Sequence, residues 1–185
     1  VELHAHQAEN LSLRFEQAIA NAFEAGFVAD AVLAQSLGQG AALWRLREAL
    51  SEAQRHEGGS IKHDVSVPVT AVPAFLEEAT AAVMRLVPGC RPVPFGHLGD
   101  GNIHFNVSQP PAMETAAFLD RWADVNACVH AIVRAQGGSI SAEHGIGQAK
   151  RHLLPTVKDP VELDLMRRMK AALDPLGLLN PGKVV

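Results

Sequence analysis

Cysteine is scarce in this chain, and no hydrophobic run is long. Cys90 and Cys128 are the only cysteines among 185 residues, so the sequence lacks the disulfide framework of small secreted domains. A reducing, cytoplasmic compartment is therefore expected. No apolar run reaches the roughly 18 residues that a membrane-spanning helix needs, and no secretory signal pattern is present.

An excess of basic residues is also missing. Lys and Arg number 16 against 20 Asp and Glu, which gives a net charge of −4. A nucleic-acid-binding surface needs a basic patch, so nucleic acid is not an expected partner. No Gly-x-Gly-x-x-Gly motif follows a predicted strand and no P-loop is present, so the chain has no nucleotide-binding fingerprint of its own.

The composition that remains is typical of a globular protein, with 48% hydrophobic and 19% charged residues. Apolar residues at helical spacing predict helices over 9–25, 38–55, 72–86, 113–135 and 160–173. Alternating or β-branched runs predict strands over 1–4, 28–34, 60–69, 91–95, 102–108 and 139–142. We therefore expect one domain over 1–185 with an α+β fold, in which helices pack on one face of an antiparallel sheet.

A predicted hairpin over 94–107 carries the first functional signal. Asp100-Gly101 is typical of a two-residue turn with positive φ at both positions. Such a turn places His97 directly opposite His104, with Cβ atoms roughly 4.5–5.5 Å apart, a spacing that suits two imidazoles sharing one metal ion. Asn106 points to the same face, because side chains alternate along a strand. The alternative is a pair of surface histidines or a stacked cross-strand pair.

A second signal lies in the glycine-rich segment 137–147, which contains Glu143-His144. Glycines allow close approach of the backbone to a ligand. With His97 and His104, Glu143 completes a two-histidine, one-carboxylate set, which suits Zn²⁺ or Mn²⁺ better than Ca²⁺. His144 is then available as a general base. The alternative is a helix-to-strand turn with a surface Glu-His pair.

Two cations form a weaker candidate site. Arg47 and Lys62 flank a predicted turn that could bring them to one edge, where Arg would hold a carboxylate with two hydrogen bonds and Lys would add a point charge. The alternative is two solvated cations. His63 is expected on the strand face opposite Lys62. The histidines without such company are expected to be surface or structural residues: His4, His6, His56, His130 and His152.

Three motifs together resemble a known family. They are Phe-Gly-His-Leu-Gly-Asp-Gly-Asn-Ile-His at 95–104, Ala-Glu-His-Gly-Ile-Gly at 142–147 and Leu-Asn-Pro-Gly-Lys at 179–183. They resemble the C-terminal half of FAD-linked 2-hydroxyacid dehydrogenases of the vanillyl-alcohol-oxidase type. The segments 44–48 and 60–68 are similar to the D-2-hydroxyglutarate and D-lactate branch, and the glycolate oxidase subunit matches less well at 60–68.

This resemblance implies a ferredoxin-like α+β region and a metal centre. In the family, residues matching His97, His104 and Glu143 hold a divalent metal, here Zn or Mn. The histidine matching His144 takes the α-hydroxyl proton while hydride leaves for the flavin.

The resemblance also implies substrate and flavin contacts. The family's Arg and Lys, matched here by Arg47 and Lys62, grip a substrate carboxylate, with Ser51 and Asn106 nearby. The tail asparagine, matched by Asn180, lies near the flavin. The expected substrate is a D-2-hydroxyacid, either D-lactate or D-2-hydroxyglutarate, and the electron acceptor stays open.

The family's FAD-binding domain is N-terminal and has no counterpart in this sequence, which begins at Val1 rather than Met. We therefore expect a piece of a longer protein whose own N-terminal flavin domain is its partner and binds most of the FAD, and we expect the piece alone to be inactive. A homo-oligomer is possible. Two other hypotheses stay open: a stand-alone metal-dependent hydrolase using the same three ligands, and a non-enzymatic small-molecule-binding module.

Overall fold

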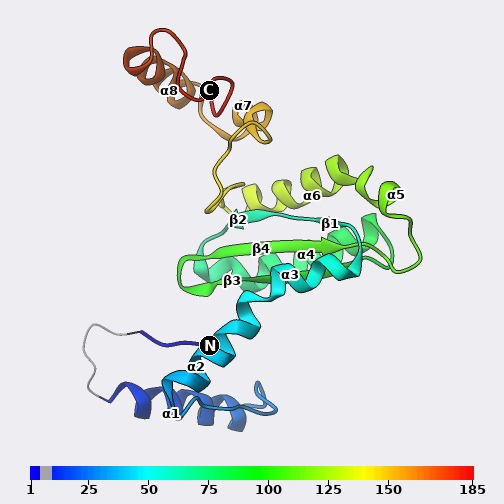
Figure 1. Ribbon diagram of the computed structural model, residues 1–185, viewed down its shortest axis with the longest axis vertical. Helices are drawn as coiled ribbons and strands as arrows, with labels where there is room; N and C mark the ends of the chain where they lie inside the picture. The colour runs from blue at the N-terminus through cyan, green and yellow to red at the C-terminus, as the bar shows by residue number, and fades with distance from the viewer. Residues whose placement is uncertain (5–9) are drawn as a thin grey trace. The chain divides into compact units, whose positions relative to one another are not determined.

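The computed structural model describes residues 1–4 and 10–185, apart from the side chains of Ser51 and Arg55. The chain forms two compact units, Val1–Leu50 and Ser51–Val185, and each is described by itself (Figure 1). None of the described helices is both long enough and apolar enough to cross a bilayer. That the whole chain is one domain of a longer protein stays a prediction.

The described residues of the first unit form the helices α1 (Leu11–Glu24) and α2 (Leu37–Glu48). Both helices were predicted. The start of α2 is capped by Ser36, whose Oγ accepts a hydrogen bond of 3.2 Å from the backbone N–H of Gln39. The strands predicted over 1–4 and 28–34 are wrong, since these residues are irregular in the structure. Their apolar residues resemble a strand, but the described part of this unit offers no neighbouring strand to pair with them.

The second unit is built on an antiparallel sheet with β4 (Asn102–Ser108) at its centre. On one side β4 pairs along its whole length with β3 (Arg91–His97). On the other side it pairs with β1 (Ser60–Ile61) and β2 (Asp64–Ser66).

One continuous register joins β1 and β2, because Ile61 lies opposite Val107 and Asp64 opposite His104. In this register Lys62 comes opposite Asn106. The strand predicted over 60–69 therefore exists, but it ends at residue 66, before Pro68 and the 3-10 turn Val69–Ala71.

The long helices of this unit are α4 (Val72–Leu86), α6 (Trp122–Ala135) and α8 (Pro160–Leu173). The predictions over 72–86 and 160–173 are confirmed. The helix predicted over 113–135 is divided into α5 (Thr115–Leu119) and α6. The helix predicted over 38–55 is likewise divided, into α2, α3 (Leu50–Ala53) and a 3-10 turn, Gln54–Glu57. A short helix α7 (Leu154–Val157) precedes α8.

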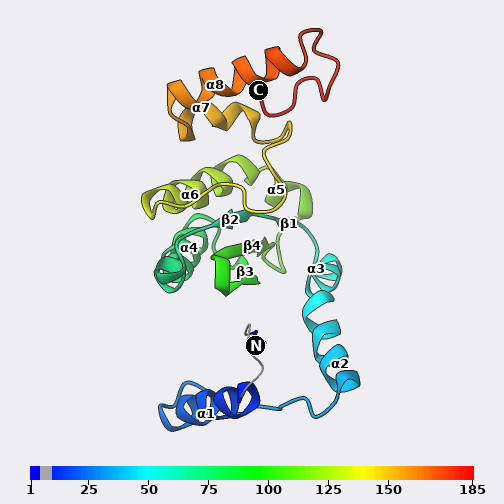
Figure 2. The ribbon, with the colours of Figure 1, turned by 90° about the vertical axis from the view of Figure 1, so that its left-hand side faces the viewer.

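The core lies between the sheet and the α4–α6 pair, which packs on one face of the strands (Figures 1 and 2). Alternate residues of β4 point into it, namely Ile103, Phe105 and Val107. The intervening residues of β4, which include His104 and Asn106, belong to the other face. The predicted α+β fold is thus confirmed, and the sheet leaves one face for polar residues.

The turn between β3 and β4 differs from the prediction. Residues 98–101 form a four-residue loop, so His97 lies opposite Asn102 and Phe95 lies opposite His104. The loop is a 3-10 turn, Leu98–Asp100, followed by Gly101 in the left-handed conformation. The predicted direct His97–His104 pair is therefore wrong. Because the register differs by two residues, an even number, both histidines still share one face of the sheet.

Replacing Gly101 by alanine is expected to lower the free energy of unfolding by about 2–4 kcal/mol. Its φ is +72°, and a Cβ there would lie 1.9 Å from the carbonyl oxygen of Val67. Urea unfolding measures the loss. Gly99→Ala in the same loop is the matched control, because a Cβ at Gly99 meets nothing within 4 Å, and it should change stability by less than about 1 kcal/mol. Equal losses in the two variants would contradict this reading of the loop.

Candidate functional site

Two imidazoles face one carboxylate on the polar side of the sheet. His97 Nδ1 lies 3.3 Å from Glu143 Oε1, and His104 Nε2 lies 3.6 Å from Glu143 Oε2. The histidines come from β3 and β4, whereas Glu143 comes from the loop 139–147, some 40 residues later. The structure therefore brings together the three residues that the sequence named as metal ligands.

A buried amide orients this carboxylate. Asn102 is 3% exposed, and its Nδ2 donates a hydrogen bond to Glu143 Oε1. Asn102 shares a strand face with His104, two residues further along β4. The sequence analysis missed Asn102, although the strand alternation that selected His104 and Asn106 also selects this position.

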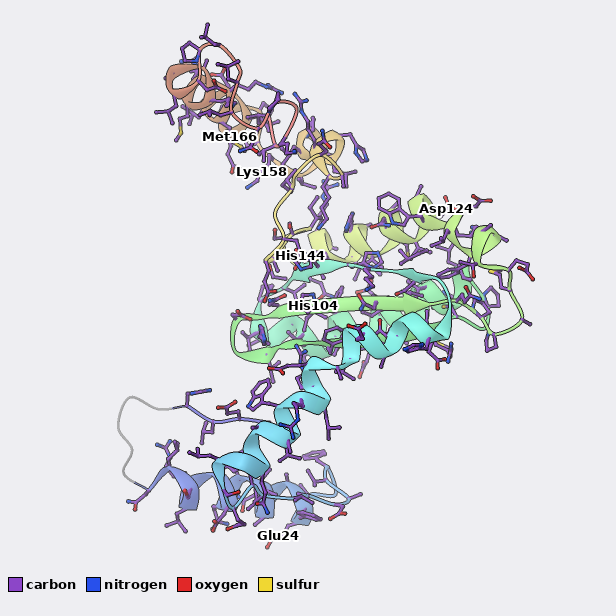
Figure 3. All side chains as sticks on the ribbon, viewed as in Figure 1. Glu24, His104, Asp124, His144, Lys158 and Met166 are labelled. Carbon is purple, nitrogen blue, oxygen red and sulfur yellow. The ribbon has the colours of Figure 1, made fainter. Side chains whose placement is uncertain are left out.

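His144 packs against His104. Their rings are stacked with centroids 5.6 Å apart and an interplanar angle of 27°, and Phe95 packs against His104 with a centroid distance of 5.2 Å. Figure 3 shows His104 on β4 and His144 on the loop beside the sheet. The His144 side chain is 68% exposed, against 15% for His104. His144 is thus the open member of the cluster, where a substrate proton could be accepted.

The loop that carries Glu143 and His144 is not the strand predicted over 139–142. Only Ser139 forms a bridge, with Ser66 of β2. The rest of the loop bonds to Asp64, a buried carboxylate on β2. Burial acts to raise the pKa of Asp64, but the hydrogen bonds from the N–H groups of His144 and Glu143 outweigh it and hold the pKa below its ordinary value. The sequence analysis missed Asp64.

Asp64 also belongs to a second group that could hold a metal. One ligand atom each from Asp64, His104 and His144 lies within 4.8 Å of the others. This group shares His104 with the first one. Both groups need the His104 imidazole, so only one of them can bind an ion at a time. Which group does so depends on whether the hydrogen bonds that Asp64 accepts leave it able to act as a ligand.

The donor set around Glu143 fits a divalent metal. Zinc binds imidazole nitrogen and carboxylate oxygen at about 2.0–2.2 Å in tetrahedral sites, which places neighbouring ligand atoms roughly 3.3–3.6 Å apart. The two N···O separations, 3.3 and 3.6 Å, fall in this range but involve different oxygens of Glu143. Among the described residues, the trio whose ligand atoms all lie within 4.8 Å of one another is Asp64, His104 and His144, so His97 and Glu143 fit a metal by donor type, and one Glu143 oxygen would have to move to serve both imidazoles.

A cavity of about 240 Å³ is lined by Gln54, Gly58, Ser60 and Lys62. Two buried polar atoms in its lining residues, Gln54 Nε2 and Ser60 Oγ, have no hydrogen-bond partner among the described residues. Gln54 Oε1 accepts a hydrogen bond of 2.9 Å from Asn106 Nδ2. The predicted substrate residues Lys62 and Asn106 thus lie on the sheet face that carries His104. Gln54 was missed, because only the fold brings it to Asn106.

The remaining predicted residues stay predictions. Arg47 lies in the last turn of α2, within the first compact unit, and the side chain of Ser51 is outside the described residues. Asn180 is exposed in the tail after α8, with a φ of +46°. That tail reaches the segment after His144, since the Val184 N–H donates a 3.0 Å hydrogen bond to the Gly147 carbonyl.

Comparison with known proteins identifies the family. Residues 1–184 match the family described as FAD linked oxidases, C-terminal domain. The chain belongs to this family. This FAD linked oxidase C-terminal domain matches only part of the longer chains of its relatives.

The chain is 45% identical over 174 residues to D-2-hydroxyglutarate dehydrogenase of Stutzerimonas stutzeri (strain A1501), covering 92% of this chain and 37% of that protein. It is 37% identical over 182 residues to mitochondrial D-2-hydroxyglutarate dehydrogenase of Rattus norvegicus, covering 97% of this chain and 32% of that protein. This FAD linked oxidase C-terminal domain thus spans about a third of the length of these relatives.

Proposed function

We propose that this chain is the substrate- and metal-binding part of a flavin-dependent dehydrogenase that oxidises a D-2-hydroxyacid to the 2-oxoacid, with D-2-hydroxyglutarate as the preferred substrate. The observation that carries the proposal is the convergence of His97 and His104 on Glu143, with His144 stacked alongside. The names of the relatives support the substrate class. A cytoplasmic compartment, expected from the two cysteines, is part of the proposal.

Each residue of the cluster has a proposed role. His97, His104 and Glu143 would hold a divalent metal, Zn or Mn, which polarises the substrate's α-hydroxyl oxygen. His144 accepts the hydroxyl proton from its exposed position beside His104. FAD, held mainly by the N-terminal flavin domain of the longer protein, supplies the acceptor for the hydride.

The cavity supports the dicarboxylate among the two expected substrates. D-Lactate has one carboxylate, whereas D-2-hydroxyglutarate has a second one at its far end. Lys62 lines this cavity together with Gln54 and Ser60. A carboxylate bound there would receive a charge-assisted hydrogen bond from the Lys62 ammonium.

Lys62→Met is therefore expected to raise the KM for D-2-hydroxyglutarate by about 10–100-fold, because a hydrogen bond between charged groups contributes about 1.5–3 kcal/mol. The KM for D-lactate should change less than about 3-fold if Lys62 serves the distal carboxylate. Lys158→Met is the matched control, since Lys158 pairs on the surface with Glu162 at 2.7 Å, and it should leave both values unchanged. An equal rise for both substrates would place Lys62 at the shared carboxylate instead.

The proposal itself is tested with the complete flavoprotein that carries this chain. We expect dye reduction with D-2-hydroxyglutarate, weaker reduction with D-lactate and none with the L-enantiomers. Removing the metal with a chelator should abolish turnover, and Zn²⁺ or Mn²⁺ should restore it. Hydrolytic turnover by the 185-residue chain without flavin would instead support a metal-dependent hydrolase.

A further inference from the structure

One buried side chain holds the loop on which both Glu143 and His144 lie. Asp64 on β2 is 5% exposed. Its Oδ2 accepts hydrogen bonds from the backbone N–H groups of His144 (2.9 Å) and Ala142 (3.1 Å). The Ser141 hydroxyl lies 3.1 Å from Oδ2 and 2.9 Å from the Gly145 carbonyl, so the two acceptors share its single proton. The N–H of Glu143 donates to Oδ1 at 3.1 Å and to Oδ2 at 3.2 Å. Three consecutive N–H groups thus point at one carboxylate.

Other contacts fix the flanks of this loop. Ser139 and Ser66 exchange two backbone hydrogen bonds of 2.8 and 3.0 Å. Lys150 Nζ donates to the Ile140 carbonyl at 2.6 Å and to the Asp64 carbonyl at 3.4 Å. These contacts anchor the segment before and after the functional pair, whereas the Asp64 carboxylate holds the backbone of the pair itself.

The same hydrogen bonds argue against Asp64 as a metal ligand. Both oxygens of the Asp64 carboxylate already accept hydrogen bonds from the loop: Oδ2 from the N–H groups of Ala142 and His144, and Oδ1 from the N–H of Glu143. Turning the carboxylate toward an ion would leave partly buried N–H groups without an acceptor, at about 1–3 kcal/mol each. The closeness of Asp64 to His104 and His144 therefore reflects its hold on the loop.

We propose that Asp64 is a positioning residue that sets both the metal ligand Glu143 and the base His144, and that it does not bind the metal. This inference rests on the proposed function for its kinetic part. Because the two residues are neighbours in sequence, one carboxylate fixes both side chains relative to β4. Loss of Asp64 should therefore weaken metal binding and proton transfer together.

Asp64→Asn in the complete flavoprotein tests the idea. Asparagine keeps one acceptor oxygen but turns an NH₂ group toward backbone N–H donors, so the loop loses its alignment. We expect Zn²⁺ affinity, measured by competition with a chelator, to fall about 10–100-fold, as for other groups that orient ligands. At saturating Zn²⁺, kcat should still be lower by at least about 10-fold. The isotope effect with substrate deuterated at C2 should rise, because the chemical step becomes slower.

Co²⁺ distinguishes a positioning residue from a ligand. The visible absorption of bound Co²⁺ reports the identity of its ligands, so Asp64→Asn should keep the wild-type band positions while Glu143→Gln shifts or loses them. A spectrum changed in Asp64→Asn as it is in Glu143→Gln would overturn the proposal. So would wild-type Zn²⁺ affinity and turnover in Asp64→Asn.

Two further variants guard against a simple loss of stability. Asn126→Ala removes another buried hydrogen bond, the 2.8 Å bond from Asn126 Nδ2 to the Trp122 carbonyl within α6, and should leave Zn²⁺ affinity and kcat unchanged. Ser141→Ala removes the hydroxyl that Asp64 shares with the Gly145 carbonyl, and it should give a smaller change in the direction of Asp64→Asn even if that variant fails to fold. If the wild type binds Zn²⁺ but oxidises no hydroxyacid, the proposed function fails, while the Zn²⁺ and Co²⁺ results still decide the role of Asp64.

Discussion

Replacing His144 by asparagine in the complete flavoprotein is expected to lower kcat by about 10²–10⁴-fold, the usual contribution of a general base. Asparagine can bond to the substrate hydroxyl but cannot take up its proton. The backbone N–H of residue 144 would still donate to Asp64, as in the wild type, where the bond measures 2.9 Å. The loop and the metal ligands should therefore keep their places. Zn²⁺ affinity should change less than about 3-fold, which separates this variant from Asp64→Asn.

The matched control is His152→Asn, because His152 is an exposed histidine only eight residues away in the same unit. It should retain wild-type kcat and KM. Steady-state dye reduction with D-2-hydroxyglutarate measures both variants. A His144→Asn protein with more than half of the wild-type kcat would remove His144 from the proposed chemistry, and the proton acceptor would have to come from elsewhere.

The hairpin shows which parts of the site follow from sequence. The turn was predicted with two residues and has four, so the exact pairing of His97 was wrong. His97 and His104 nevertheless share one face of the sheet, because side-chain direction depends only on whether the register shift is odd or even. A shift of one residue would have turned His97 away from the other ligands. Strand alternation thus predicts which residues share a face of the sheet more reliably than the turn type predicts which residues lie directly opposite each other.

Asp64 and Gln54 show what the sequence could not reveal. Asp64 bonds to residues 77 to 80 positions later, and Gln54 bonds to Asn106 across 52 positions. No local pattern marks such contacts, because they depend on which strands become neighbours. The strands predicted at 1–4 and 28–34 were wrong for a related reason. A segment with a strand-like composition forms a strand only when another strand pairs with it. Helices α4 and α8 were predicted closely because helix hydrogen bonds and Pro at the first turn are local.

On the core face of the sheet, two histidines are buried away from the candidate site. His63 is 1% exposed and His130 is 7% exposed, and their rings meet edge to face with centroids 5.8 Å apart. His63 Nδ1 lies 2.7 Å from the Phe105 carbonyl and donates to it. The Nε2 atoms of both rings have no hydrogen-bond partner among the described residues. At Nε2, therefore, neither ring has an acceptor that would stabilise a proton.

Burial, helped by the nearby Lys150 ammonium, lowers the pKa of both imidazoles to about 4. For His63, the hydrogen bond to Phe105 opposes this change and the neighbouring His130 adds to it. In the unfolded chain a histidine titrates near its ordinary value of about 6.5. Between about pH 6.5 and 4 the unfolded chain thus binds more protons than the folded one.

The free energy of unfolding is therefore expected to keep its full value above about pH 6.5. It should fall by about 2 kcal/mol per pH unit as the pH drops toward 4, since each of the two imidazoles contributes up to about 1.4 kcal/mol per unit. The total is comparable with the whole stability of a typical domain, about 5–15 kcal/mol. Urea unfolding of metal-free protein at pH 7, 6 and 5 measures the slope. A chelator is needed because metal binding is itself coupled to histidine protonation.

His130→Phe should roughly halve this slope, because it removes one of the two titrating rings and keeps an aromatic side chain edge to face with His63. His152→Gln is the control, since His152 is exposed in the same unit, and it should keep the wild-type slope. A wild-type slope in His130→Phe would mean that the ring is protonated in the folded protein. The C2 proton of His130 in NMR spectra gives an independent measure, and its chemical shift should stay constant from pH 8 down to about pH 5.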